Sequence, residues 1–221
     1  MALDRIHLRK LLLILFLPAN KRRSAIRRDV REENARAAGA RSSGGDFYGD
    51  FWADAKSHVF GLGDLHTLVD ARIAANARRR NLYPRLRDGF LLWWNERRRW
   101  TNEPFHPGPH LKAQFTFPEF EATVKVDRVL SVRDGLGVEH AIYPYFAPEP
   151  ILSAEAGRLG LWLLIQALPI VPADEIRILD VIQGQTFSID RYPLHGDEEV
   201  IFRRLYEQLL REWEALREAD D

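Results

Sequence analysis

The sequence contains no cysteine in its 221 residues. Disulfides, thiolate zinc sites, iron–sulfur clusters and cysteine nucleophiles are therefore excluded for this chain, and a reducing compartment, the cytoplasm, is its expected location. Lysine is also scarce, because almost all the cations are arginine. A GC-rich bacterial genome is the favoured explanation of this bias, although arginine also suits phosphate binding.

A hydrophobic run long enough to cross a bilayer is also missing. The run at 11–17 has seven apolar residues behind basic ones, and no small-residue cleavage pattern follows it. Membrane attachment is therefore the less favoured interpretation of this run, and we expect none. This run is predicted to be a helix that is either buried or docked onto a protein partner or a second copy, with Leu13, Phe16 and Leu17 as its interface residues.

Charge is balanced over the whole chain, with 32 cationic and 32 acidic residues, but it is uneven along the chain. Residues 1–45 are strongly basic and are predicted to form a helical arm that ends in a Gly/Ser-rich linker at 39–45. Residues 46–221 are expected to fold as a single mixed α/β domain. The basic end would steer an anionic partner, or help subunits dock head to tail.

The spacing of apolar residues switches from a helical period to a period of two and back. A strand meander, a crossover helix and further strands predict a mixed central sheet flanked by helices. The expected helices cover 65–80, 82–100, 154–168 and the residues after 197, and the expected strands cover 111–117, 122–132, 138–146, 175–182 and 185–190.

This order of elements, with a lone aspartate in the strand Val124-Lys125-Val126-Asp127-Arg128-Val129, resembles the PD-(D/E)XK nuclease superfamily over residues 82–216. The resemblance implies a restriction-endonuclease-like fold. In that family an aspartate on the second strand and a D/E-x-K tripeptide on the third bind a divalent metal, which activates a water for attack on a phosphodiester. Asp127 stands at the first position, but Tyr143 and Tyr145 replace the acid and the lysine. Tyrosine is neutral at pH 7 and a poor ligand for a hard cation, so the resemblance implies a scaffold without the activity.

Two further interpretations of Asp127 stay open. The favoured one is an ion pair with Arg128 or with an arginine of a neighbouring helix, which is a common fate of strand carboxylates. In the other, Asp127 and Glu139 form a displaced metal site. The chain is then an active nuclease that uses Mg²⁺ or Mn²⁺, whereas otherwise no cofactor is expected.

Two arginine triplets, each at the end of a predicted helix, are the strongest positive feature. Arginines that neutralise several phosphates would give salt-dependent binding without sequence preference, although a solvated helix end is an equally good interpretation. Tyr143 and Tyr145, on either side of Pro144, are expected to be exposed at a strand end and to serve a protein interface. The residues expected to bind nucleic acid are Arg22, Arg23, Arg78, Arg79, Arg80, Arg97, Arg98 and Arg99.

Taken together, these features favour a non-catalytic, nucleic-acid-associated module with a degenerate nuclease-like fold. We expect it to be a subunit of a larger bacterial assembly, for example in phage defence. One alternative is a protein-interaction or scaffold subunit that does not bind nucleic acid. The other is the active metal-dependent nuclease.

Overall fold

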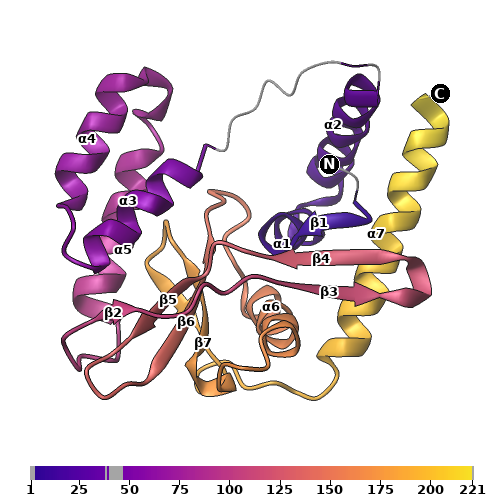
Figure 1. The fold of residues 1–221 in the computed structure, drawn as a ribbon. Helices are drawn as coiled ribbons and strands as arrows, with labels where there is room; N and C mark the ends of the chain where they lie inside the picture. Colours follow the sequence, from indigo (N-terminus) through magenta and orange to yellow (C-terminus); the bar gives the residue numbers. More distant parts are fainter. Residues whose placement is uncertain (1–2, 38, 40–46, 221) are drawn as a thin grey trace.

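The computed structural model describes residues 3–37, 39 and 47–220, and the strands of this part of the chain form two sheets (Figure 1). A sheet of three strands has the order β1-β4-β3, and a sheet of five strands has the order β2-β5-β6-β7-β8. The strands are β1 (Arg5–His7), β2 (His106–Pro107), β3 (Ala113–Phe117), β4 (Ala122–Val126), β5 (Leu130–Arg133), β6 (Glu139–Tyr145), β7 (Ile176–Asp180) and β8 (Gln185–Phe187).

The larger sheet is mixed, which confirms the expected α/β fold. β5 and β6 are antiparallel, β6 and β7 are parallel, and α6 (Ala154–Ala167) makes the crossover between the parallel pair. This helix begins where predicted, because the side chain of Ser153 accepts a hydrogen bond from the backbone N–H of Ala156. β6 is buried on both faces, as a central strand between two helical layers should be.

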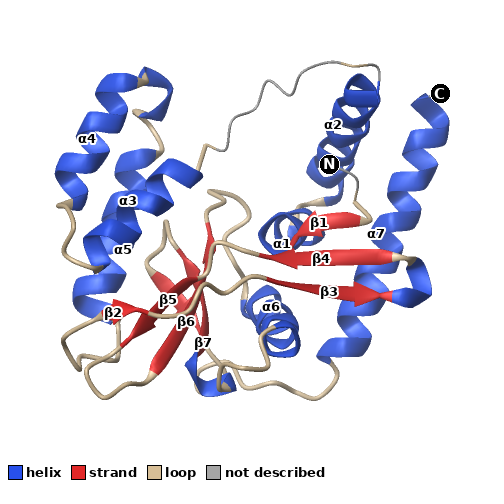
Figure 2. Ribbon diagram, viewed as in Figure 1, coloured by secondary structure: helices blue, strands red, loops and turns tan. Residues whose placement is uncertain are grey.

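Helices cover both faces of this sheet and form two apolar cores (Figure 2). On one face lie α3, α4 and α5, whose aliphatic and aromatic side chains form a core with residues of β5, β6 and β7. On the other face, α6 packs together with α1, α7 and the smaller sheet. The remaining helices are α1 (Leu8–Phe16), α2 (Ala19–Ala37), α3 (Gly49–Val59), α4 (Leu65–Ala75), α5 (Tyr83–Leu92) and α7 (Glu198–Asp220).

The strand predicted at 122–132 is two strands in different sheets, so the expectation of a three-stranded antiparallel meander is wrong. β4 ends at Val126 and β5 begins only at Leu130. Between them Arg128 adopts a left-handed conformation with φ of 62°, which turns the chain out of the first sheet. Two side chains of α3 donate hydrogen bonds to the carbonyl groups that this turn leaves without a strand partner. Trp52 Nε1 donates to the carbonyl of Arg128 at 2.6 Å, and Lys56 Nζ donates to the carbonyl of Val129 at 2.8 Å.

The N-terminal residues belong to the same packed unit as the rest and do not form an appended arm. β1 pairs in parallel with β4, and α1 buries its apolar residues in the core beneath the smaller sheet. α2 contacts α7 through the buried Ile26 and Val30. The linker predicted at 39–45 lies, apart from Gly39, outside the described residues.

Candidate functional site

Asp127 lies at the junction of the two sheets, where residues of β1 and α1 hold its carboxylate. Its Oδ1 accepts a hydrogen bond from Arg9 Nη1 at 2.7 Å, and its Oδ2 lies 3.1 Å from His7 Nδ1. Burial alone raises the pKa of Asp127, but the contacts with His7 and Arg9 outweigh burial and hold that pKa at about 2. The carboxylate is therefore charged, and it is engaged by an arginine from a neighbouring helix.

The residues considered for a divalent-metal site do not fit one. Glu139 is the first residue of β6 and Tyr145 is the last, so the two side chains lie at opposite ends of this strand. The carboxylate of Glu139 is also paired with Arg133 at 2.6 Å. Burial raises the pKa of Tyr143 to about 12 and also raises the pKa of Tyr145, so both phenols are neutral at pH 7. A cation at the junction would meet one carboxylate that is already paired with a guanidinium, which is a poor donor set for Mg²⁺ or Mn²⁺.

The expectation that Tyr143 and Tyr145 are exposed at an interface is wrong. Each is 1% exposed, because helices cover both faces of the central strand that carries them. Tyr143 Oη accepts a hydrogen bond from the backbone N–H of Arg9 at 2.9 Å, and Tyr145 Oη donates to the carbonyl of Pro150 at 2.7 Å. Both phenols thus fix neighbouring segments of the fold.

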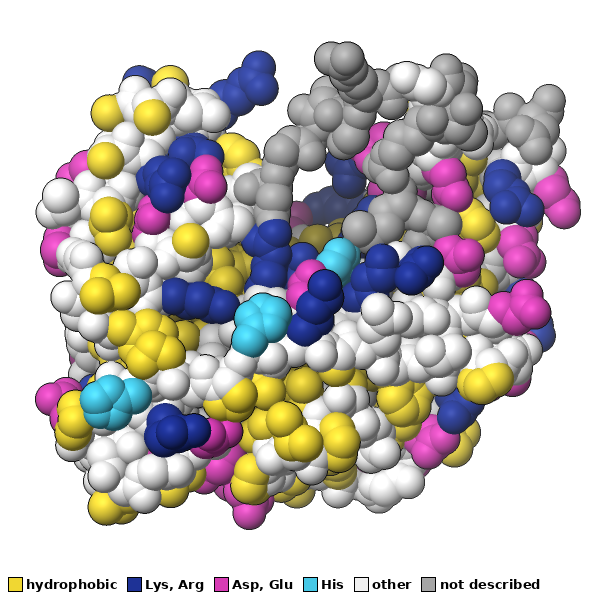
Figure 3. All heavy atoms as spheres, in the orientation of Figure 1, with side chains coloured by type: hydrophobic (Ala, Val, Ile, Leu, Met, Phe, Trp, Pro, Cys, Tyr) yellow, Lys and Arg dark blue, Asp and Glu magenta, His cyan; other side chains and the backbone are white. Residues whose placement is uncertain are grey.

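Next to Arg9 the surface is hollowed into a cavity of about 260 Å³ between α1, α2 and the end of β6, which we call the α1–α2 cavity. Its walls are mainly apolar, and Arg9, Lys10 and Arg28 bring positive charge to it. Asp29 is the carboxylate of the lining; it is 2% exposed, and its Oδ2 lies 2.6 Å from Lys10 Nζ. Figure 3 shows Lys, Arg and His side chains gathered at the middle of one face, where the surface is hollowed.

A groove continues from the α1–α2 cavity between the two helices that name it. It shares Leu13 and Arg28 with the cavity and ends near Leu17 and Lys21, which pairs with Glu149 at 2.6 Å. Of the three interface residues predicted in the 11–17 run, Leu13 and Leu17 thus line an accessible groove. The third, Phe16, is only partly buried and packs against the core.

Further cations surround the junction beside the cavity. Burial lowers the pKa of Lys56, against the opposing influence of Asp127. Burial also lowers the pKa of Arg128, and the nearby Arg9 guanidinium lowers it further. In the described part of the chain, the cations Arg9, Lys10, Arg28, Lys56 and Arg128 thus lie in this region together with the carboxylates Asp29 and Asp127.

α2 also carries exposed arginines. Arg23, Arg27 and Arg31 recur every four residues, which places them on one face of the helix. None of these three side chains pairs with another residue that the structure describes. Arg22, which was also predicted to bind nucleic acid, instead pairs with Glu212 of α7 at 3.0 Å.

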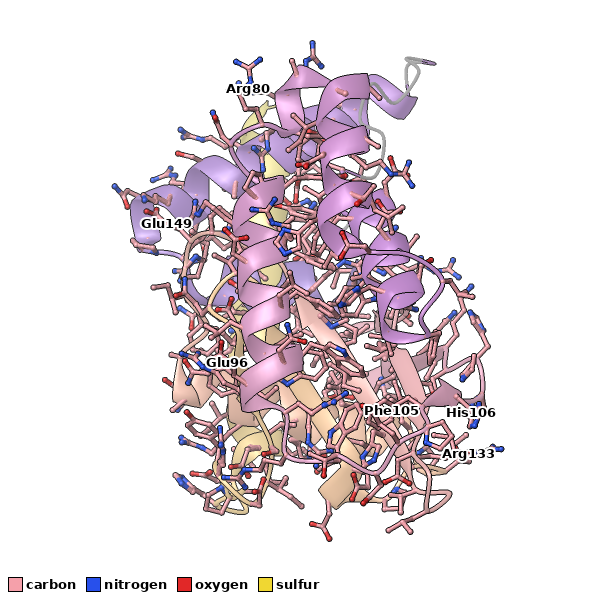
Figure 4. All side chains as sticks on the ribbon, turned by 90° about the vertical axis from the view of Figure 1, so that its left-hand side faces the viewer. Arg80, Glu96, Phe105, His106, Arg133 and Glu149 are labelled. Carbon is pink, nitrogen blue, oxygen red and sulfur yellow. The ribbon has the colours of Figure 1, made fainter. Side chains whose placement is uncertain are left out.

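The two arginine triplets do not come together. Figure 4 shows Arg80 near one end of α5 and Glu96 beyond the other end, so the triplets lie at opposite ends of one helix. In the first triplet, Arg79 pairs with Asp50 and lies over the ring of Tyr83. Arg78 and Arg80 are exposed, and their side chains have no partner within the described ranges.

The second triplet is engaged within the protein. Arg97 Nη1 donates to the carbonyls of Gln183 and Gly184 at 3.0 and 3.2 Å, which ties a π-helical turn at 93–97 to the β7–β8 connection. The guanidinium carbon of Arg98 lies 3.9 Å from the centroid of the Trp94 ring. Arg99 pairs with Asp190.

Two other groups of ionisable residues stabilise the fold. His140 is 3% exposed and stacks on Trp100, with 4.3 Å between the ring centroids. Its Nδ1 lies 2.5 Å from Glu175 Oε2. Near the start of α7, His195, Asp197 and Glu198 lie close together. Glu198 accepts hydrogen bonds from the backbone N–H groups of His195 and Gly196, so its carboxylate fixes the backbone that leads into α7.

The cationic region around Arg9 was only partly predictable. Arg9, Lys56 and Arg128 come close because α1, α3 and the β4–β5 junction converge in space, and no local sequence pattern predicts that convergence. The basic composition of residues 1–45 and the four-residue spacing of Arg23, Arg27 and Arg31 are the sequence signals that indicate this side of the molecule.

Comparison of the chain with protein-family models, with curated proteins and with solved structures finds no match. None of the described helices combines the length and the apolar character needed to span a bilayer. The geometry of the cationic region is therefore the basis on which we infer a function.

Proposed function

We propose that the chain is a non-catalytic nucleic-acid-binding module of a larger cytoplasmic bacterial assembly, built on a degenerate nuclease-like scaffold. The observation that carries this proposal is the row of exposed arginines on α2 (Arg23, Arg27 and Arg31), which have no partner among the described residues. Another face of the same helix lines the cation-rich α1–α2 cavity with Ala25 and Arg28. Arginines without a carboxylate partner gain more from a phosphate than arginines that must first break an ion pair. Binding of phosphates to them releases condensed counterions, which is the main source of sequence-independent affinity.

The spacing of these arginines suits a phosphate backbone. Four residues of helix rise about 6 Å. A nucleic-acid strand carries one charge about every 3.4 Å of axis, so a strand lying along α2 offers a phosphate within reach of each of the three side chains. Arg28 lies on the neighbouring face, towards the cavity, and extends the charged surface.

The test is equilibrium binding of labelled single- and double-stranded DNA and RNA between about 50 and about 200 mM salt. The triple variant Arg23→Gln/Arg27→Gln/Arg31→Gln should lose at least about tenfold in affinity, and its logarithmic salt slope should be shallower by about 2 to 3. The matched control replaces three exposed arginines of α7, Arg204, Arg211 and Arg217, with glutamine.

The control triple has the same net charge as the α2 triple but should keep its affinity. Equal losses in both triples would show that net charge, and not α2, accounts for binding. If none of the four nucleic acids binds even at the lowest salt, the proposal is wrong.

A substitution at Asp127 separates this proposal from the active-nuclease alternative. Asp127→Asn removes a carboxylate from among Arg9, Lys56 and Arg128, so a binding module should hold nucleic acid at least as tightly as the wild type. A nuclease would lose Mg²⁺- or Mn²⁺-dependent cleavage of a labelled strand instead. Metal-dependent cleavage by the wild type that disappears in Asp127→Asn would favour the nuclease.

A further inference from the structure

We infer that the α1–α2 cavity receives one unpaired base of a single-stranded nucleic acid whose phosphates lie on Arg28 and the other exposed arginines of α2. The inference rests on the proposed function and adds to it a preference for strands with accessible bases. It follows from the juxtaposition of a charged rim and an apolar, partly aromatic wall in one cavity of about 260 Å³.

The two parts of the cavity suit the two parts of a nucleotide. Ile14, Phe146 and Ala147 contribute apolar wall, whereas Arg9 and Arg28 contribute cations. A phosphodiester held by the cations leaves its base free to enter the apolar part. In a duplex the bases are paired and stacked, so only a single strand or an extruded nucleotide can present a free base face to such a cavity.

Aromatic rings already form a stack at the cavity. The rings of Tyr48 and Phe146 are 5.0 Å apart between centroids with planes 8° from parallel, and both residues line the cavity. Tyr48 is partly exposed, so its ring is the accessible member of the pair. Every base has a π-face, and stacking on aromatic side chains therefore supports binding without sequence preference.

The carboxylate in the lining argues against an anionic group inside the cavity. Asp29 is 2% exposed, and Lys10 is its ion-pair partner at 2.6 Å. A phosphate or another anion that entered the interior would lie close to this buried negative charge, which costs free energy in a poorly solvated site. The neutral base is therefore the part of a nucleotide that we place in the cavity, with its phosphate on the exposed Arg28.

The experiment compares two oligonucleotides of equal length and charge, one with all bases present and one with consecutive abasic sites. We expect the wild type to bind the complete strand at least about fivefold more tightly. A fluorescent 2-aminopurine at the centre of the complete strand should change its emission on binding.

A variant that fills the cavity without altering charge provides the second measurement. Ala25 is a partly buried wall residue on α2, so Ala25→Trp should abolish both the preference for bases and the 2-aminopurine response while keeping salt-dependent binding. Ala35→Trp, at an exposed position of the same helix, is the control and should behave as the wild type. Circular dichroism of both variants checks that they fold.

The outcomes separate the two proposals. Equal affinity of the wild type for complete and abasic strands overturns the base-binding inference and leaves the proposed function intact; this comparison needs no variant. Retention of the base preference in a folded Ala25→Trp overturns the assignment to this cavity. Absence of binding to either strand at low salt overturns the inference and the proposed function together.

Discussion

Both α2 and the segment that follows α5 are rich in arginine, but the arginines of the two segments differ in whether the protein itself engages them. Arg97, Arg98 and Arg99 are adjacent in the chain, yet each is engaged by backbone carbonyls, by aromatic rings or by a carboxylate. The arginines at positions 23, 27 and 31 are spread over two turns of helix, and none has a partner among the described residues. The triplet after α5 is the more conspicuous pattern, but the spaced arginines of α2 are available to a ligand, as are Arg78 and Arg80 of the other triplet.

The difference shows that a local cluster of cations is a poor measure of available charge. Three consecutive side chains after a helix point in different directions, so some of them meet the fold itself. Residues four apart on a helix point the same way, and a helix packed on one side leaves such a stripe in solvent. If this contrast is correct, substitutions after α5 should change stability, and substitutions on α2 should change binding.

The largest expected effect is on stability, in Arg98→Ala. The side chain of Arg98 is 13% exposed, and its guanidinium lies over the rings of Trp94 and Phe105. Its removal leaves a gap over these rings and should lower the free energy of unfolding by about 2–3 kcal/mol. Urea denaturation measures this loss.

Arg98→Lys tests the geometry behind that loss. An ammonium cannot stack on Trp94 as a planar guanidinium does, so lysine should recover only part of the stability. Nucleic-acid affinity of both variants should stay within about twofold of the wild type while they are folded. A stable Arg98→Ala with weakened binding would reverse the contrast between the two regions.

The next effect is the pH dependence of stability that Asp127 causes. Its folded pKa of about 2 lies below the reference value of 3.8, so the carboxylate stabilises the native state at neutral pH and loses that contribution as pH falls through its folded pKa. The contribution should be about 1–2 kcal/mol at pH 7, because part of the carboxylate is screened by solvent.

Urea unfolding of the wild type and of Asp127→Asn at a series of pH values measures this contribution. The difference between the two proteins should be largest near pH 7 and should shrink as pH falls below about 4 towards 2. A difference that does not change with pH would show that the ion pair with Arg9 does not stabilise the fold.

Much of the larger sheet follows from sequence because its signals are local. Ser153 marks the start of α6, and the near-continuous apolar character of that helix indicates its central place. The break at Asp127 and Arg128 has no such signal, because apolar residues continue on both sides of it and neither glycine nor proline stands there. The turn depends on Trp52 and Lys56 of a distant helix, whose hydrogen bonds satisfy the freed carbonyls.

The candidate site was harder to predict than the sheet, because it also depends on contacts between segments that are far apart in the sequence. The basic character of the N-terminal segment is evident from composition, and Arg23 was among the predicted contacts. The place of Arg9 beside Asp127 requires the parallel pairing of β1 with β4, a long-range contact that periodicity cannot detect. Sequence therefore indicates the cationic segment but not the cavity that it helps to form.

A smaller effect is expected from a single arginine of α2. Arg27→Ala removes one exposed and unpaired cation, so affinity for nucleic acid should fall by about three- to fivefold at low salt, and the salt slope should become shallower by about 1. Stability should change by less than about 0.5 kcal/mol, since alanine has the higher helix propensity and no contact is lost. Fluorescence anisotropy titrations and urea denaturation on the same preparation separate the two quantities.

The smallest effect is expected in Arg99→Gln, which tests whether an exposed but paired arginine contributes to binding. Arg99 and Asp190 are 55% and 48% exposed, so theirs is a surface ion pair worth at most about 0.5 kcal/mol. Affinity should fall by less than about twofold, because Asp190 already neutralises this cation and α2 lies elsewhere on the molecule. The same titrations as for Arg27→Ala measure it. A loss as large as that of Arg27→Ala would mean that a bound strand displaces Asp190, and the distinction between paired and unpaired arginines would then fail as a guide to the binding surface.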